Sequence, residues 1–235
     1  RDRLLWEARV LARLKHPNVV RVHDCGVSAE GRSFLVTELL EGPTLEQVLT
    51  QPGPRLPLRE ACRLGGQAAR ALADLHALGL ALGGSQGALQ ASHLVVEQDL
   101  LASGGERLRL VNLAAIAPTG PTGRRVLGLL DGQARSRAGV IDRDGAEGER
   151  LQRRDELALG ELLFRMLTGA RCASGAGLDA GAQLAGRWEQ LAATQPRRER
   201  AAVVALGALL LPALSTDAPM GVSARRLEQA LQQVA

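Results

Sequence analysis

The sequence predicts an α+β domain in which short strands pair locally and helices fill the second half. Two observations lead to this class. In the first half, short apolar runs are joined by turn residues, whereas from Asp155 onward apolar residues recur every three or four positions. Because the strands come in local pairs and do not alternate with helices, a parallel α/β sheet is not expected. A chain of 235 residues with 46% hydrophobic residues can bury a substantial core.

The first forty residues are expected to hold a helix and a hairpin. Apolar residues at helical spacing predict a helix over residues 1–15. It ends before Pro17, because proline disfavours helical backbone at the residue ahead of it. Two strand-like runs follow, Val19–Val27 and Ser33–Leu39, joined by turn residues at 28–31.

The remaining elements are predicted in turn. Thr44 caps a short helix that ends near Thr50. The longest helix of the first half steps from Leu58 to His76 and stops at Gly79. The rest of the pattern predicts short strands at 94–96 and 108–111, an irregular segment at 117–150, and helices at about 155–168, 182–193, 199–211 and 222–234.

Charge and cysteine content exclude several classes of function. The 29 basic and 25 acidic residues form no continuous basic face and aromatics are only 2%, so nucleic-acid binding is not expected. Three cysteines without a Cys-x-x-Cys pair predict neither a zinc site nor a disulfide framework, and they favour a reducing cytoplasm. The most apolar run, residues 201–214, is too short to span a membrane. With neither an initial Met nor a signal peptide, the chain is expected to be a cytoplasmic piece of a longer protein.

A series of short motifs runs along the whole chain. In order they are Glu-Ala-Arg from Glu7, His-Pro-Asn-Val-Val from His16, Val-Thr-Glu-Leu-Leu-Glu-Gly from Val36, Leu-His-Ala-Leu-Gly from Leu75 and Asp-Glu-Leu-Ala-Leu-Gly from Asp155. In this order and spacing they resemble helix αC, the strand after it, the hinge, the helix before the catalytic loop and helix αF of bacterial-type Ser/Thr protein kinases. The resemblance implies a two-lobe protein-kinase-like fold. Residues 1–41 would be the remainder of an N-lobe truncated at αC, and residues 42–235 a mainly helical C-lobe.

The catalytic positions of that family carry residues of different chemistry here. Aligned without a gap on the strand that begins at Leu94, Ala88 stands at the catalytic Asp, Gln90 at the Lys and His93 at the metal-binding Asn. Asn112 stands at the Asp of the Asp-Phe-Gly motif. A general base is typically worth ~10²–10⁴ in rate, and Ala88 cannot act as one. Mg²⁺ prefers charged oxygen ligands, which neither His93 nor Asn112 supplies. The resemblance therefore implies a degenerate member, a pseudokinase, with no catalytic residue intact.

The same resemblance assigns possible nucleotide contacts to the hinge. Its main chain and an apolar floor would accept an adenine ring at Glu38, Leu39, Leu40 and Val95. With the metal positions changed, no cofactor is expected to be required: ATP would bind weakly, and Mg²⁺ would not bind. The alternative is a cleft filled by side chains that binds no nucleotide.

Structural roles are expected for two carboxylates. Glu7 corresponds to the residue that holds the ATP lysine in a working kinase, but the glycine-rich loop and that lysine lie outside this chain. Asp155 is expected to anchor the backbone of the degenerate catalytic loop, with a helix cap as the simpler alternative. His93 is expected to be a polar pocket or surface residue, not a metal ligand. Trp188 is expected to pack half-buried, the alternative being an exposed docking residue.

The expected function is a regulatory or scaffolding domain in a signalling protein. Its partners would be other protein domains or signalling proteins, with no nucleic acid and no membrane insertion by this domain. The alternative is a divergent ATP-dependent protein Ser/Thr kinase, which a glycine-rich loop and ATP-binding lysine upstream of Arg1 would favour. An aminoglycoside-type phosphotransferase shares the fold but would need the aspartates that are lost here.

Overall fold

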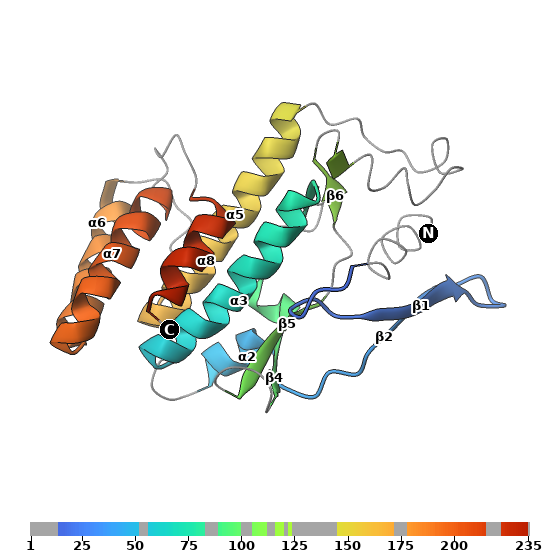
Figure 1. The fold of residues 1–235 in the computed structure, drawn as a ribbon, viewed down its shortest axis with the longest axis horizontal. Coiled ribbons are helices and arrows are strands. Elements are labelled where there is room, and N and C mark those ends of the chain that lie inside the picture. Colours follow the sequence, from blue (N-terminus) through green and yellow to red (C-terminus); the bar gives the residue numbers. More distant parts are fainter. Residues whose placement is uncertain are drawn as a thin grey trace.

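Short strands pair next to their turns in the first half, and helices follow. The computed structural model describes residues 14–51, 56–82, 89–99, 105–111, 116–119, 122–123, 145–171, 178–214 and 222–234. Its elements are β1 (Val22–Val27), β2 (Ser33–Thr37), α2 (Leu45–Thr50), α3 (Leu58–Ala77), β3 (Leu80–Ala81), η1 (Ala91–His93), β4 (Leu94–Gln98), β5 (Glu106–Leu110), β6 (Ala117–Pro118), α5 (Gly145–Thr168), α6 (Leu178–Thr194), α7 (Arg197–Leu214) and α8 (Ala224–Gln232). This order confirms the predicted α+β class (Figure 1). The predicted helix over residues 1–15 lies outside the described residues except for Leu14 and Lys15, which are not helical.

The first hairpin, β1–β2, forms around the predicted turn. The Ser28 N–H donates to the Arg32 carbonyl at 2.8 Å. Gly31 has a φ of 77°, a left-handed conformation that glycine adopts without strain. The first strand begins later than predicted, because the Val20 N–H donates to the Leu110 carbonyl at 2.9 Å and so pairs with β5 instead. In Figure 1 the hairpin projects away from the body of helices.

Two further antiparallel pairs lie nearer the helices. β4 and β5 pair from Leu94–Leu110 to Gln98–Glu106, as the two apolar runs predicted. β3 and β6 pair residues that are far apart in the sequence, Leu80 with Pro118 and Ala81 with Ala117. The sequence did not predict this pair, because strands of two residues show no periodicity.

Helix α5 begins at Gly145, well before the predicted start near residue 155. Its early turns are polar, and their sequence therefore looks irregular. Tertiary packing explains the extension: Leu151 is buried in a small cluster with Ala81 and Ala117, which belong to the β3–β6 pair. Helix α7 likewise runs past its predicted end, and Pro212 lies inside it.

Helix α3 forms the centre of the core. It packs against α8 and α5, and Figure 1 shows the three helices side by side. A Cβ on Gly65 would lie 2.2 Å from a methyl carbon of Leu163, so this glycine permits the close approach of α3 and α5. α3 ends at the predicted position, where Gly79 has a φ of 71°.

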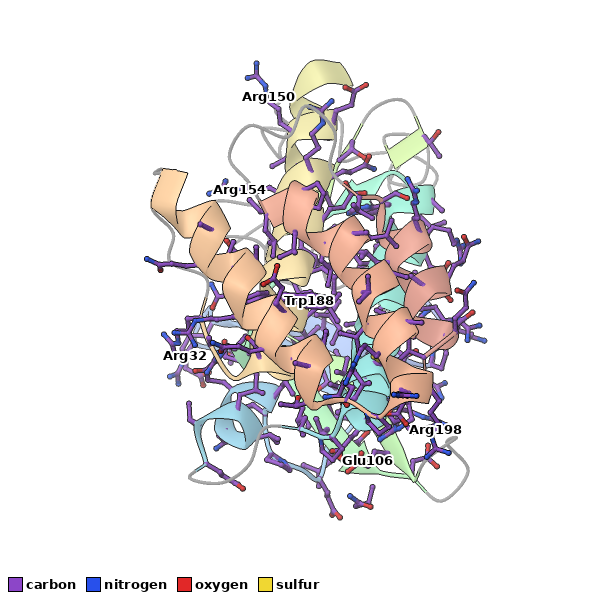
Figure 2. The ribbon with its side chains drawn as sticks, turned by 90° about the vertical axis from the view of Figure 1, so that its left-hand side faces the viewer. Arg32, Glu106, Arg150, Arg154, Trp188 and Arg198 are labelled. Carbon is purple, nitrogen blue, oxygen red and sulfur yellow. The ribbon has the colours of Figure 1, made fainter. Side chains whose placement is uncertain are left out.

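The helices α6 and α7 form an outer pair that Trp188 joins. Trp188 is buried, more deeply than expected, and its indole Nε1 donates to the Val203 carbonyl at 2.9 Å (Figure 2). The side chain therefore packs inside the domain and is no exposed docking residue. Figure 2 places Arg32, Arg150 and Arg198 at separate edges of the molecule.

Candidate functional site

The His-Pro-Asn segment ties the chain ahead of β1 to the core. His16 Nδ1 accepts the Asn18 N–H at 3.0 Å, so Nε2 carries the proton and donates to Asp74 Oδ2 at 3.1 Å. Burial, partly offset by Asp74, lowers the pKa of His16 and favours the neutral ring. The buried Asn18 amide donates to Gln67 Oε1 at 2.7 Å and to the Leu108 carbonyl at 2.9 Å. This segment is thereby fixed to α3 and β5.

The predicted hinge follows β2, and Glu38 forms bonds through both its backbone and its side chain. Its N–H donates to the Arg21 carbonyl at 3.0 Å, and its Oε1 accepts the Arg21 N–H at 2.7 Å. Its Oε2 lies 2.6 Å from Arg109 Nη2. Leu39 is 84% exposed, whereas Leu40 is half-buried and packs against the core. The hinge therefore has an anchored beginning and an outward-facing middle.

The residues that follow the predicted hinge, 42–44, pack against β4. A Cβ on Gly42 would lie 2.0 Å from the Val96 carbonyl oxygen, so only glycine fits there. The Val96 N–H donates to the Pro43 carbonyl at 2.9 Å, and Thr44 forms an antiparallel bridge with Val95. Val95 is 9% exposed. The structure thus brings the predicted hinge and the predicted apolar floor into neighbouring segments.

Only part of the predicted catalytic loop falls within the described residues. Ala88, Asn112 and Glu7 lie outside them. Gln90 is exposed, and its carbonyl accepts the His93 N–H at 2.9 Å. The His93 carbonyl accepts the Val111 N–H at 2.7 Å, and burial lowers the pKa of the half-buried His93 ring. The His93 backbone is therefore hydrogen-bonded to Val111, the residue that precedes Asn112 in the sequence.

Asp155 is fully buried within α5. Its Oδ2 accepts the Leu82 N–H at 2.7 Å and lies 3.2 Å from His76 Nε2. Because α5 begins at Gly145, Asp155 lies inside the helix, and the alternative of a helix cap is excluded. Leu82 is the last described residue before the predicted catalytic loop. Asp155 thus holds the backbone at the entrance to that loop.

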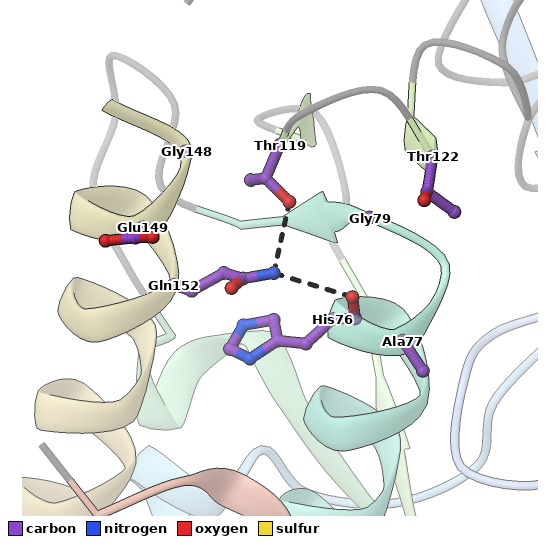
Figure 3. Close-up of a pocket in the computed structure, with 8 residues that line it drawn as sticks. All are labelled: His76, Ala77, Gly79, Thr119, Thr122, Gly148, Glu149 and Gln152. Carbon is purple, nitrogen blue, oxygen red and sulfur yellow. Dashed lines mark hydrogen bonds between the residues drawn. The ribbon is translucent and has the colours of Figure 1, made fainter. Parts of the chain in front are cut away.

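A pocket of about 280 Å³ opens at the C-terminal end of α3 (Figure 3). It lies between α3, the residues after β6 and the first turns of α5, and it is lined by His76, Ala77, Gly79, Thr119, Thr122, Gly148, Glu149 and Gln152. Gln152 Nε2 donates to Thr119 Oγ1 at 3.1 Å and to the His76 carbonyl at 3.4 Å. Among the residues that the structure describes, the lining contains a carboxylate but no Lys or Arg, which disfavours a phosphate group there. The hinge and β4–β5 remain the candidate nucleotide site.

The described part of the chain offers neither a metal cluster nor a membrane span. Within the described ranges, no group of three or more His, Cys, Asp or Glu side chains could hold a metal ion. In the same part of the chain, no helix has the length and apolar character needed to cross a membrane.

Sequence reasoning missed Arg109, whose guanidinium joins several segments around the hinge. It contacts Glu38, Glu97 and the Pro17 carbonyl. In the sequence, Arg109 is recognisable only as a cation on β5 between Leu108 and Leu110, both of which are buried. That pattern predicts an outward-facing arginine but gives no information about distant partners.

Comparisons with known proteins agree with this fold. Residues 1–80 match the family described as protein tyrosine and serine/threonine kinase. Serine/threonine-protein kinase PknA of Mycobacterium tuberculosis (strain ATCC 25618 / H37Rv) is 46% identical over 83 residues, which are 34% of this chain and 19% of PknA. Serine/threonine-protein kinase PkaA of Streptomyces coelicolor (strain ATCC BAA-471 / A3(2) / M145) is 46% identical over 78 residues, 33% of this chain and 14% of PkaA. The matched segment is thus a small part of these relatives.

A solved structure extends the likeness over the full chain. The crystal structure of the Mycobacterium tuberculosis PknI kinase domain superimposes with a TM-score of 0.61 at 22% identity, covering 100% of this chain and 79% of that one. At this identity the likeness shows the fold alone. The chain therefore has a protein-kinase-like fold, and its first third is similar in sequence to bacterial Ser/Thr kinases.

Proposed function

We propose that this domain is a pseudokinase with a regulatory or scaffolding role in a signalling protein. The main support is the absence of acidic residues from two stretches of the sequence. From Ala77 to Val96 the chain contains no Asp, Glu, Lys or Arg, and from Arg107 to Leu130 it contains no Asp or Glu. These stretches cover the predicted catalytic loop and the position of the Asp-Phe-Gly motif. A shift of the alignment by a few residues would therefore restore neither the base nor a metal-binding carboxylate.

The missing groups are the ones that phosphoryl transfer needs. The reaction depends on positioning and on neutralising phosphate charge with Mg²⁺ and cationic side chains. Ala88 cannot accept the proton of an attacking hydroxyl. Asn112 offers a neutral oxygen and His93 a ring nitrogen, and neither suits a hard cation. The residues present do not fit Mg²⁺, so no catalytic step is assigned to this cleft.

Weak nucleotide binding is compatible with this proposal. Adenine recognition needs only main-chain groups and apolar surface, which Glu38 to Leu40 and Val95 would provide. The Glu38 side chain is bonded to Arg21 and Arg109, and its N–H donates to the Arg21 carbonyl, so an adenine ring would rely on the main chain of Leu39 and Leu40. We therefore propose that ATP binds weakly, if at all, and without help from Mg²⁺.

A scaffolding role is supported by anchors that hold the fold without contributing chemistry. Asp155 binds the backbone of Leu82, and the pair His16 and Asn18 fixes the segment ahead of β1 to the core. A domain that retains such anchors while its loop lacks charged groups is suited to presenting a constant surface. The proposed partners are other domains of the same protein or signalling proteins.

The alternative remains a divergent ATP-dependent protein Ser/Thr kinase. The 46% identity with PknA over 83 residues favours it, since PknA is a Ser/Thr kinase by its printed name. That identity covers 34% of this chain, and the differences in the catalytic loop weigh against transfer.

Phosphoryl transfer tests the proposal. Purified full-length protein is incubated with labelled ATP, Mg²⁺ or Mn²⁺ and generic protein substrates, beside an active bacterial Ser/Thr kinase as positive control. We expect no incorporation above the level without protein. Labelled product, formed after mass spectrometry has excluded a contaminating kinase, would support the alternative.

A further inference from the structure

Arg109 is the centre of a cluster at the base of the β1–β2 hairpin. Its guanidinium lies 2.6 Å from Glu38 Oε2 through Nη2 and 3.2 Å from Glu97 Oε2 through Nε. Nη1 donates to the Pro17 carbonyl at 2.7 Å. One side chain of β5 therefore contacts the hinge, β4 and the segment that leads into β1.

Each carboxylate in the cluster also accepts a hydrogen bond from a backbone N–H. Glu38 Oε1 accepts the Arg21 N–H at 2.7 Å, and Glu97 Oε1 accepts the Glu41 N–H at 3.3 Å. The first contact lies just before β1 and the second at the far end of the hinge. Through these two carboxylates, Arg109 connects the segment just before β1 with the end of the hinge.

Burial separates this cluster from an ordinary surface ion pair. Exposed pairs are worth little, because water and salt screen them. The Arg109 side chain is only 12% exposed, and those of Glu38 and Glu97 are 23% and 20% exposed. A planar guanidinium also offers donors in fixed directions, so it can serve three acceptors at once.

We propose that Arg109, Glu38 and Glu97 form a hinge latch that holds the β1–β2 hairpin at one angle to α3 and β4–β5. Kinase-like enzymes that close over a substrate need a hinge that moves. Here the hairpin projects from the body of helices (Figure 1), and the latch secures its base. The inference rests on these contacts and does not depend on whether the domain transfers phosphate.

The chain offers a matched control on the same strand. Arg107 Nη2 lies 2.6 Å from Asp99 Oδ2, and this pair stays within the β4 and β5 end of the molecule. Arg107→Gln removes a cation and an ion pair from β5 without touching the hinge. Arg109→Gln removes the same charge from the latch.

Hydrogen exchange of the full-length protein measures the latch directly. The readout is the exchange rate of peptides that contain the amides of Arg21, Glu38 and Glu41, followed by mass spectrometry. In Arg109→Gln we expect these amides to exchange about tenfold faster or more, the effect of losing charge-assisted hydrogen bonds. In Arg107→Gln we expect no acceleration there. Equal exchange in the two variants would overturn the proposal.

Milder variants keep the test decisive if Arg109→Gln does not fold. Glu38→Gln should accelerate exchange at Arg21, and Glu97→Gln should accelerate exchange at Glu41. Because the three side chains act as one unit, the double variant Glu38→Gln with Glu97→Gln should accelerate exchange at both amides by less than the product of the single effects. The proposal would be wrong if the accelerations of the two single variants multiply in the double variant, or if neither single variant accelerates exchange.

Discussion

Replacing Asp155 with alanine should strongly destabilise the domain. The carboxylate is fully buried and accepts the Leu82 N–H at 2.7 Å, with His76 Nε2 at 3.2 Å. Hydrogen bonds to a charged group are worth about 1.5–3 kcal/mol each, and both donors would lose their acceptor. Part of this cost is offset, because Oδ1 is buried without a hydrogen-bond partner in the described part of the chain. We expect a net loss of about 3 kcal/mol of unfolding free energy.

Thermal unfolding measures this loss. For a domain of this size, about 1 kcal/mol shifts the midpoint by roughly 2–4 °C, so Asp155→Ala should unfold about 6–12 °C below the unmodified protein. Arg154→Ala, an exposed change at the neighbouring position of α5, serves as control and should unfold within about 2 °C of the unmodified protein. A similar midpoint for the two variants would refute the reasoning that Asp155 anchors the loop.

Two further outcomes follow from the segments around the hinge. Burial lowers the pKa of His16, so the folded state disfavours protonation and should lose stability as the pH falls below the unfolded value of about 6.5. In His16→Gln the thermal midpoint should fall less steeply with decreasing pH than in the exposed control His23→Gln. Equal slopes of midpoint against pH in the two variants would contradict this role of His16. Gly42→Ala should lower the midpoint by several degrees, since its Cβ would lie 2.0 Å from the Val96 carbonyl oxygen; an unchanged midpoint would show that the hinge shifts freely.

Much of the fold could be predicted from local patterns. The hairpin turn near Gly31, the cap at Thr44 and the helix stop at Gly79 all lie where the sequence placed them. Each depends on a residue type with a strong local preference: glycine for positive φ and threonine for the N-cap. The start of α5 could not be found in this way, because its polar first turns are stabilised by packing of Leu151 against Ala81 and Ala117.

The candidate site was less accessible to sequence reasoning. The resemblance assigned nucleotide contacts to Glu38, Leu39, Leu40 and Val95, which stays a prediction, and it did not identify Arg109 as the partner of Glu38. Its contacts join residues distant in the sequence, such as the Pro17 carbonyl, and no local periodicity encodes such pairs. The roles of Ala88, Asn112 and Glu7, outside the described residues, stay predictions.

Calorimetric titration of ATP into the full-length protein, with and without Mg²⁺, tests the central claim that the cleft lacks a metal site. The resemblance places Asn112 and His93 at the metal positions of the kinase family, and no acidic residue lies between Arg107 and Leu130. We therefore expect weak or undetectable binding that Mg²⁺ does not strengthen. A gain in affinity of about tenfold or more on adding Mg²⁺, equivalent to roughly 1.4 kcal/mol, would contradict it, because other residues would then have to supply a working metal site.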